Sequence, residues 1–227
     1  MMGDLGGLLF GITIWAIPLI FAVTLHEAAH GYAAHACGDD TAYRLGRISL
    51  NPLRHIDPFG TIILPGLLLA MGGVMFGWAK PVPVNFSRLR HPRRDMVIVA
   101  AAGPAMNMGL AILAILAVHL VPVVPEAMRS WFFLNLENAI FFNLLLAVFN
   151  MIPLPPWMGA GWRWVFCPGP GLASGPHGKG GNADLIAALF LFPLLGNQFG
   201  VDLDVFLWLV QGPVDTIGNA LVRMLGP

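Results

Sequence analysis

The sequence predicts an all-α polytopic membrane protein, and its composition carries that prediction. Of the 227 residues, 57% are hydrophobic and 11% are charged, whereas a soluble domain carries about 25% charged residues. Several apolar runs also approach the length that a membrane-spanning helix needs, about 20 residues. The formal net charge is zero, so nothing suggests a nucleic-acid partner. Two cysteines, Cys37 and Cys167, are too few for a disulfide framework or a cysteine-based zinc site.

The first predicted helix covers about residues 5–35 and is apolar as far as Leu25. Pro18 is a predicted kink within this helix, and Gly38 is its predicted end. The residues before it lack a basic region and a clear cleavage site, so we expect this span to be retained. A polar loop follows over residues 38–58.

Two further spans are predicted at residues 96–121 and 131–152. The composition of the following stretch differs from that of the rest of the chain, and two apolar segments come after it, at 184–199 and 205–225. We expect a single membrane-embedded domain over residues 1–227 with three parts: a core at about 5–156, an anomalous segment at 157–182, and two C-terminal helices within 184–225.

The apolar segment at 61–76 decides the predicted topology. If it crosses the membrane, the loops place eight Lys and Arg residues on one face and four on the other. If it enters and returns, eleven lie on one face and Arg129 alone lies on the other. The second arrangement obeys the positive-inside rule better. The sequence therefore favours a re-entrant segment in a multi-pass protein of the cell membrane, with the basic loops in the cytoplasm.

The apolar part of the first helix leads into the motif His26-Glu27-Ala28-Ala29-His30. On a helix the two imidazoles leave the same face one turn apart, so they can take two positions of a tetrahedral Zn²⁺. Glu27, on the adjoining surface, can activate a water molecule. The alternative is a chance pattern of polar residues at a membrane interface. Ionisable residues after about twenty apolar ones are costly and usually functional, which favours the metal site.

Together with four other motifs, this one resembles the site-2 protease family of intramembrane zinc metalloproteases, in a compact form without a PDZ domain. That family carries out regulated intramembrane proteolysis. The matching motifs run in the family's order over residues 20–156: His26-Glu27-Ala-Ala-His30; Gly46-Arg47-Ile-Ser-Leu-Asn51-Pro52 with His55-Ile-Asp57-Pro58-Phe-Gly60; Gly77-Trp-Ala-Lys-Pro-Val-Pro-Val-Asn85; Ala102-Gly103-Pro104-Ala-Met-Asn107; and Phe149-Asn150-Met-Ile-Pro153-Leu-Pro155-Pro156.

The resemblance implies a three-helix catalytic core, here about residues 5–36, 96–121 and 131–152, with zinc held inside the bilayer near the cytosolic face. It also implies a short β element. Residues 77–85, which their prolines keep extended, would form a strand beside the site and capture an unwound substrate helix by strand addition. The implied partners are a transmembrane protein substrate and membrane lipid.

The resemblance also implies roles for individual residues. His26 and His30 are zinc ligands, Glu27 is the general base and later the acid, and Asn150 hydrogen-bonds the substrate or its oxyanion. The alternative for Asn150 is a buried amide that only caps a broken helix end. His35 falls on the opposite face of a regular helix and is not a predicted ligand.

One position departs from the family's pattern. The family places an aspartate, its third ligand, eight residues after the Asn of the last motif, and this chain has Met158 there. A thioether is a poor ligand for Zn²⁺, and two histidines alone would hold the metal weakly. Asp57 is the best substitute in the chain, although it can also be interpreted as a loop cap.

Two functions therefore stay open. The chain is either an intramembrane zinc metalloprotease that hydrolyses peptide bonds within or near transmembrane segments, or an inactive family member that binds transmembrane helices without cleavage. A transporter with a metal site is disfavoured, because the chain lacks repeats and paired discontinuous helices.

The codons of residues 157 to about 180 indicate how Met158 arose. Trp and Met have a single codon each, so the codons of Trp157-Met158-Gly159 constrain the neighbouring reading frame. Read one base earlier, they encode Leu, Met or Val followed by Asp and Gly, as the family motif requires. We interpret this stretch as the product of a one-base frame error, with a genuine divergent loop as the alternative.

Overall fold

The computed structural model describes residues 2–55, 57, 63, 80–152 and 207–227. The described part is mostly helical and contains no β-strand. Its α-helices are α1 (Met2–Ala36), α2 (Thr41–Arg44), α4 (Pro92–Val118), α5 (Glu126–Met151) and α8 (Gly212–Leu225). Short turns of other helix types lie at Pro52–Arg54, Phe86–Arg88, Val121–Val123 and Leu207–Gln211.

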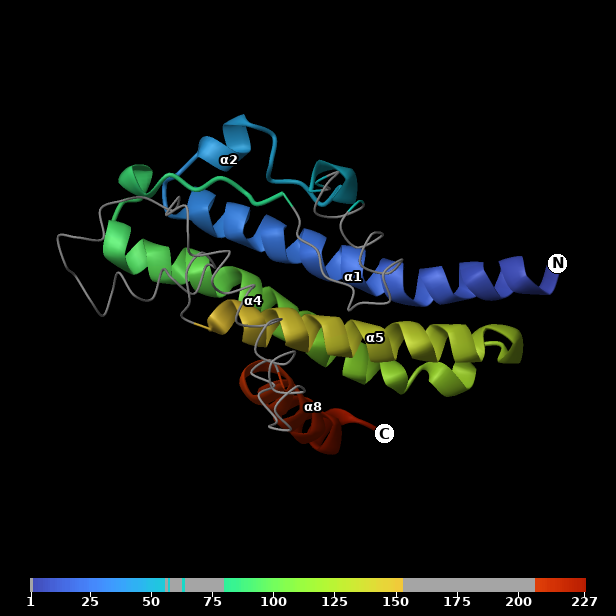
Figure 1. Ribbon diagram of the computed structural model, residues 1–227. Coiled ribbons are helices and arrows are strands. Elements are labelled where there is room, and N and C mark those ends of the chain that lie inside the picture. Colours follow the sequence, from blue (N-terminus) through green and yellow to red (C-terminus); the bar gives the residue numbers. More distant parts are fainter. Residues whose placement is uncertain (1, 56, 58–62, 64–79, 153–206) are drawn as a thin grey trace, which may run out of the picture.

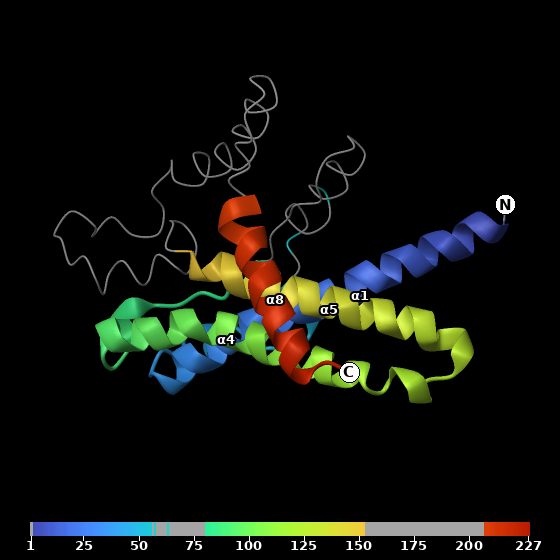
Figure 2. The same ribbon diagram turned by 90° about the horizontal axis from the view of Figure 1, so that it is seen from below.

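Helices α1, α4 and α5 pack against one another as a three-helix bundle (Figure 1). Neighbours along the chain run in opposite directions, so α4 returns along α1 and α5 returns along α4. Helix α8 lies across α4 and α5 (Figure 2). All three bundle helices are long and apolar enough to cross a membrane. The three predicted spans are therefore confirmed as helices, each to within a few residues of its predicted bounds.

Gly38 ends α1 as predicted. Its φ is +107°, a conformation that L side chains rarely adopt. The Gly38 N–H donates to the His35 carbonyl at 3.0 Å, and the Asp39 N–H donates to the Ala34 carbonyl at 2.9 Å. These two bonds are the pair that defines a Schellman cap. The chain can therefore leave the helix with its last carbonyls satisfied.

Pro18 lies inside α1, which continues through it. Proline has no N–H, so the carbonyl of Ile14, one turn earlier, loses its helical donor. The side-chain amide of Asn138 in α5 donates to that carbonyl at 2.9 Å. Two turns earlier in α5, the Trp131 indole N–H donates to the hydroxyl of Thr13, the residue next to Ile14, at 3.0 Å. The carbonyl that Pro18 leaves without a helical donor thus becomes a specific contact between α1 and α5.

The predicted strand at 77–85 is not found in its described part, residues 80–85, which is extended but unpaired. Pro81 and Pro83 have no N–H to give to a ladder, which explains why this edge does not build a sheet here. Side chains of α1 and its cap bind the segment instead. The Val82 N–H donates to the Glu27 carboxylate at 2.8 Å, and the Asn85 N–H donates to the Asp39 carboxylate at 2.6 Å.

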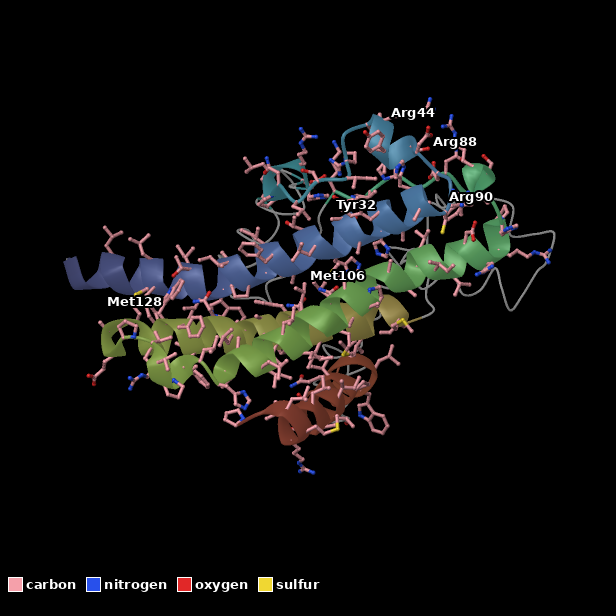
Figure 3. The ribbon with its side chains drawn as sticks, turned by 180° about the vertical axis from the view of Figure 1, so that it is seen from behind. Tyr32, Arg44, Arg88, Arg90, Met106 and Met128 are labelled. Atoms are coloured by element: carbon pink, nitrogen blue, oxygen red, sulfur yellow. The ribbon has the colours of Figure 1, made fainter. Side chains whose placement is uncertain are left out.

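The parts of the chain before and after the 61–76 segment meet at two places. The Lys80 N–H donates to the His55 carbonyl at 2.9 Å. The Arg90 N–H donates to the Cys37 carbonyl at 3.0 Å, which joins the end of α1 to the approach to α4. Figure 3 shows Arg44, Arg88 and Arg90 at this end, whereas Met128, next to Arg129, lies at the other. A re-entrant segment requires this arrangement. Residues 64–76 and the anomalous segment 157–182 lie outside the described residues, as does the predicted helix at 184–199.

Candidate metal centre

The two motif histidines meet inside the bundle. Both leave the same face of α1, and their side chains are 5% (His26) and 1% (His30) exposed. Their Nε2 atoms are 3.0 Å apart, with the rings nearly perpendicular. The helical spacing of the motif therefore produces the convergence that the sequence predicts.

Each histidine has a partner at its other ring nitrogen. Nδ1 of His30 is 2.7 Å from the Val99 carbonyl oxygen, and Nδ1 of His26 contacts the side-chain oxygen of Asn107. Both partners belong to α4. An oxygen acceptor at Nδ1 requires a proton there, so each Nε2 carries a lone pair instead.

This donor set fits a zinc ion. Two lone pairs that face each other at 3.0 Å repel unless a cation or a proton lies between them. Zinc–nitrogen bonds of about 2.0–2.1 Å in a tetrahedral site hold two nitrogens about 3.3 Å apart. The His26–His30 pair needs only a small opening to reach that separation. Histidine ligands also commonly donate their other ring N–H to an oxygen, as both do here.

Gly103 makes room for the pair. A Cβ built at this position would lie 2.6 Å from ring atoms of His26 and would also collide with Nε2 of His30. Any side chain at position 103 would therefore occupy the space between α4 and the histidine pair. The sequence contained Gly103 and Asn107 in one of the matching motifs, but nothing local indicated that they face the histidines.

Glu27 lies one residue after His26, and its side chain faces the extended segment at residues 80–85. Its Oε2 accepts the Val82 N–H, and Arg47 lies close enough for its charge to act on the carboxylate. The Arg47 guanidinium donates to the carbonyls of Lys80 at 2.8 Å and Pro81 at 3.3 Å, and to that of Arg54. Arg47 thus holds the backbone that in turn orients Glu27.

Asn150 lies one residue before the end of α5. Its side-chain Nδ2 donates to the Leu146 carbonyl of its own helix at 2.9 Å. This bond belongs to the helix end and involves neither histidine. The substrate-binding role of Asn150 therefore stays a prediction.

The third ligand is not found in the described part of the chain. Among those residues, no third His, Cys, Asp or Glu joins the pair, so Asp57 does not complete the site there. Met158 lies outside the described residues. His35 stacks on Tyr43, with ring centroids 5.0 Å apart, and does not reach the pair.

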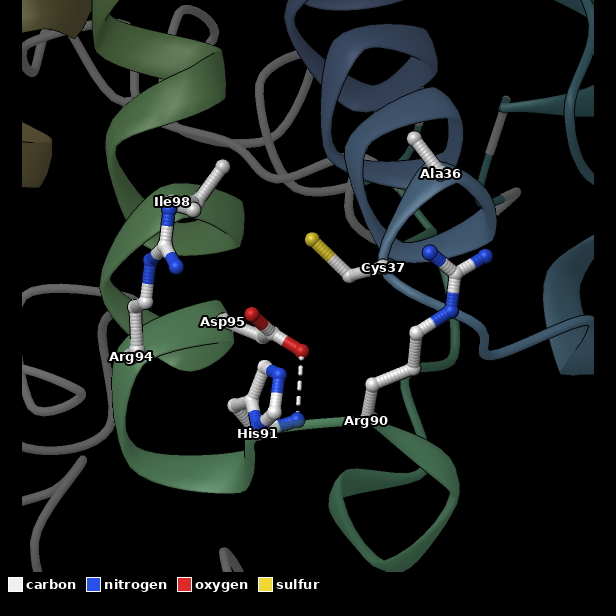
Figure 4. Close-up of a pocket in the computed structure, with 7 residues that line it drawn as sticks. All are labelled: Ala36, Cys37, Arg90, His91, Arg94, Asp95 and Ile98. Atoms are coloured by element: carbon white, nitrogen blue, oxygen red, sulfur yellow. Dashed lines mark hydrogen bonds between the residues drawn. The ribbon is translucent and has the colours of Figure 1, made fainter.

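A separate pocket of about 310 Å³ lies between the end of α1 and the start of α4 (Figure 4). Burial raises the pKa of the Cys37 thiol in this pocket; the charge of Asp95 adds to that shift, while Arg90 and Arg94 oppose it. A raised pKa keeps the thiol protonated at neutral pH, which makes it a poor nucleophile.

A buried histidine pair with lone pairs converging, and a carboxylate on the same turn, defines a candidate zinc centre of the hydrolytic type. Comparison with known proteins agrees with this class. No family model and no solved structure matches the chain. Curated relatives do match it, and their names describe zinc metalloproteases.

The "Putative zinc metalloprotease YwhC" of Bacillus subtilis is 43% identical over 144 residues, which cover 62% of this chain and 63% of that protein. The "Putative zinc metalloprotease Rip2" of Mycolicibacterium smegmatis is 29% identical over 143 residues, 63% of this chain and 52% of that protein. Rip2 of Mycobacterium tuberculosis is 29% identical over 136 residues, 60% of this chain and 50% of that protein. The chain thus spans between half and two thirds of the length of these relatives.

Proposed function

We propose that this chain is an intramembrane zinc metalloprotease that hydrolyses peptide bonds within or near transmembrane segments of membrane proteins. The observation that carries the proposal is the pair of Nε2 atoms of His26 and His30, 3.0 Å apart and buried. The pair belongs to a helix long and apolar enough to cross a membrane. The names of the relatives support the protease class and the metal.

His26 and His30 would hold the zinc ion through Nε2. When bound, zinc polarises a carbonyl group and lowers the pKa of water to about 7. Glu27 would accept a proton from the attacking water while the oxygen of that water bonds to the peptide carbonyl carbon. The same carboxyl would give that proton to the amide nitrogen as the C–N bond breaks. Val82 holds one carboxylate oxygen of Glu27, which orients the group for both transfers.

The extended segment at residues 80–85 would receive the substrate. A peptide bond inside a helix is shielded by its own hydrogen bonds, so a substrate helix must unwind before attack. An extended stretch of chain beside Glu27 offers backbone groups to an unwound strand. Because Pro81 and Pro83 lack N–H groups, their edge offers carbonyl acceptors only. Asn150 would bind the substrate or its oxyanion from the end of α5.

A second function is favoured by one feature of the sequence. Met158 stands where the related family has its third ligand, and no described residue replaces that ligand. A chain that holds zinc weakly could still bind transmembrane helices without cutting them. The nucleotide sequence across codons 150–185 decides whether the stretch around Met158 is genuine or the product of a frame error.

The test compares four forms of the full chain in membranes: the chain as printed, Met158→Asp, a form with the reading frame restored across 157–180, and that restored form with Glu27→Gln. Zinc is measured after dialysis against a chelator, and cleavage is measured on a set of single-pass transmembrane reporters. We expect Met158→Asp to tighten zinc retention, and the restored form to cleave. Glu27→Gln should keep zinc and lose cleavage, because glutamine cannot accept the proton.

Two results would contradict the proposal. If the restored form carrying Glu27→Gln still cuts at the rate of its parent, Glu27 is not the base. If the restored form retains zinc but cuts none of the reporters, the binding function replaces the protease. Equal zinc retention in the printed chain and in Met158→Asp would show instead that another residue already completes the site.

A further inference from the structure

A chain of side-chain amides crosses the bundle and ends at His26. Asn107 of α4 and Asn143 of α5 are 0% and 3% exposed. Nδ2 of Asn107 is 2.7 Å from Oδ1 of Asn143 and 3.3 Å from the Ala22 carbonyl of α1. Nδ2 of Asn143 is 2.8 Å from the Ala139 carbonyl. The three long helices of the bundle therefore all contribute to one buried network.

The two backbone carbonyls give this network a direction. A carbonyl only accepts, so the amide atom of Asn143 that faces Ala139 must be its NH₂ group. Oδ1 of Asn143 then faces α4 and requires a donor there, which must be Nδ2 of Asn107. The Ala22 carbonyl requires the same orientation. Oδ1 of Asn107 is therefore left for Nδ1 of His26, and that nitrogen must carry the proton.

We infer that Asn107 and Asn143 are positioning residues that set the tautomer of His26, so that its Nε2 presents a lone pair at the metal site. The inference rests on the proposed zinc function. It adds that Asn143 of α5 orients Asn107, the partner of His26. An imidazole without such a partner shares its single proton between both nitrogens. With the amides in place, inverting any one of them would put two acceptors or two donors together in a buried site, where unmade hydrogen bonds are costly. Helix α5 therefore acts on the metal site without contributing a ligand to it.

A purely structural role of the two asparagines is the competing explanation, and Asn138 provides a matched control. Asn138 is on α5, as Asn143 is, and its amide donates to a carbonyl of α1, as that of Asn107 does, at 2.9 Å. That carbonyl belongs to Ile14, three helical turns before the motif, so Asn138 stands apart from the network that ends at His26. Asn138→Leu should also lower stability, but it should leave zinc affinity unchanged.

The experiment measures two quantities on the whole chain as printed. Zinc affinity is obtained by competition with a chelating indicator, for wild type and for Asn143→Leu, Asn107→Leu, Asn107→Asp and Asn138→Leu. The tautomer of His26 is read in the metal-free wild type from imidazole ¹⁵N chemical shifts, assigned by difference from His26→Gln.

We expect Asn107→Leu and Asn143→Leu to weaken zinc binding by roughly 10–100-fold, the usual range for partners of metal ligands. Asn107→Asp should stay within a few-fold of wild type, because its carboxylate still accepts the Nδ1 proton of His26. A structural role alone predicts the opposite ranking, since a carboxylate at position 107 would face the oxygens of both Ala22 and Asn143. We expect wild-type His26 to carry its proton on Nδ1.

The inference is overturned if His26 carries its proton on Nε2 in the metal-free wild type. It is also overturned if Asn138→Leu weakens zinc binding as much as Asn143→Leu. Failure of the proposed function looks different. If the protein has the Nδ1 tautomer and binds zinc but cuts no reporter, the role of the asparagine network is upheld and only the proposed protease activity is contradicted.

Discussion

Gly103 of α4 shows how closely the site is built at the scale of single residues. Its Cα faces both histidines, and the space that a Cβ would need is taken by their rings. Gly109 lies on the same helix, and a Cβ there would meet nothing within 4 Å. Gly103 therefore faces the histidine pair, whereas Gly109 has free space beside it and serves as a control on the same helix.

We expect Gly103→Ala to weaken zinc binding by at least about tenfold, because the methyl group would displace the imidazoles from their converging positions. Gly109→Ala should leave zinc binding unchanged and raise the free energy of unfolding by up to about 1 kcal/mol, the gain in helix propensity. Zinc competition and thermal unfolding measure the two effects. Wild-type zinc affinity in Gly103→Ala would show that the histidine pair does not depend on this close approach.

At the scale of elements, the extended segment at residues 80–85 is held by side chains rather than by a sheet. Arg47 donates to three backbone carbonyls, two of them in Lys80 and Pro81. Glu27 and Asp39 accept backbone N–H groups from the same segment. By contrast, Arg44 and Arg88 bind the partly exposed Asp40 at 2.5 and 2.6 Å, and surface pairs of this kind contribute little to stability.

We expect Arg47→Gln to speed hydrogen exchange at the Val82 amide by at least about tenfold, since hydrogen bonds to a charged group contribute roughly 1.5–3 kcal/mol. Arg44→Gln is the control and should leave that amide unchanged. Exchange measured by mass spectrometry on the peptide that contains Val82 gives the readout. Equal exchange in Arg47→Gln and wild type would show that Glu27 holds the segment without help.

The junction between α1 and α5 depends on a carbonyl that Pro18 leaves free. Asn138→Leu should lower the free energy of unfolding by about 0.5–1.5 kcal/mol, the usual net contribution of a hydrogen bond, because this bond is only partly buried. In a Pro18→Ala background the same change should cost less, because the alanine supplies the missing N–H to Ile14. Thermal unfolding of the four proteins forms a double-mutant cycle. Additive effects would mean that Asn138 and Pro18 act independently.

At the scale of the whole molecule, the bundle determines which loops share a side. The end of α1 and the start of α4 meet, and Arg44, Arg88 and Arg90 lie at that end of the bundle. Arg129 lies at the start of α5. This geometry supports the re-entrant topology that the charge count favours.

We expect cysteines placed at Ser49 and Ser87 to be labelled from the same side of the membrane, and a cysteine at Ser130 from the other. The background would lack Cys37 and Cys167, and an impermeant maleimide would be applied to intact cells and to inverted vesicles. Labelling of positions 49 and 87 from opposite sides would mean that 61–76 crosses the membrane.

The sequence by itself determined the features that depend on neighbours along the chain. Apolar runs of sufficient length predicted the three helices, a glycine predicted the end of α1, and the spacing of His26 and His30 predicted their convergence. Each depends on residues within about one or two helical turns, where backbone geometry alone relates the side chains. The strand at 77–85, which the resemblance implied, was wrong for its described part, because strand formation also needs a pairing partner that no local pattern supplies.

Only the tertiary structure decided how the histidines are held. Asn107 is separated from His26 by 81 residues, Val99 from His30 by 69, and Val82 from Glu27 by 55. No periodicity connects positions so far apart, so a glycine and an asparagine in α4 carry no local sign of facing the site. Packing of α1 against α4 and α5 brings them together, because each buried polar group must find its partner within the bundle. Helix length and motif spacing are thus local properties, whereas the tautomer and orientation of the ligands arise from packing.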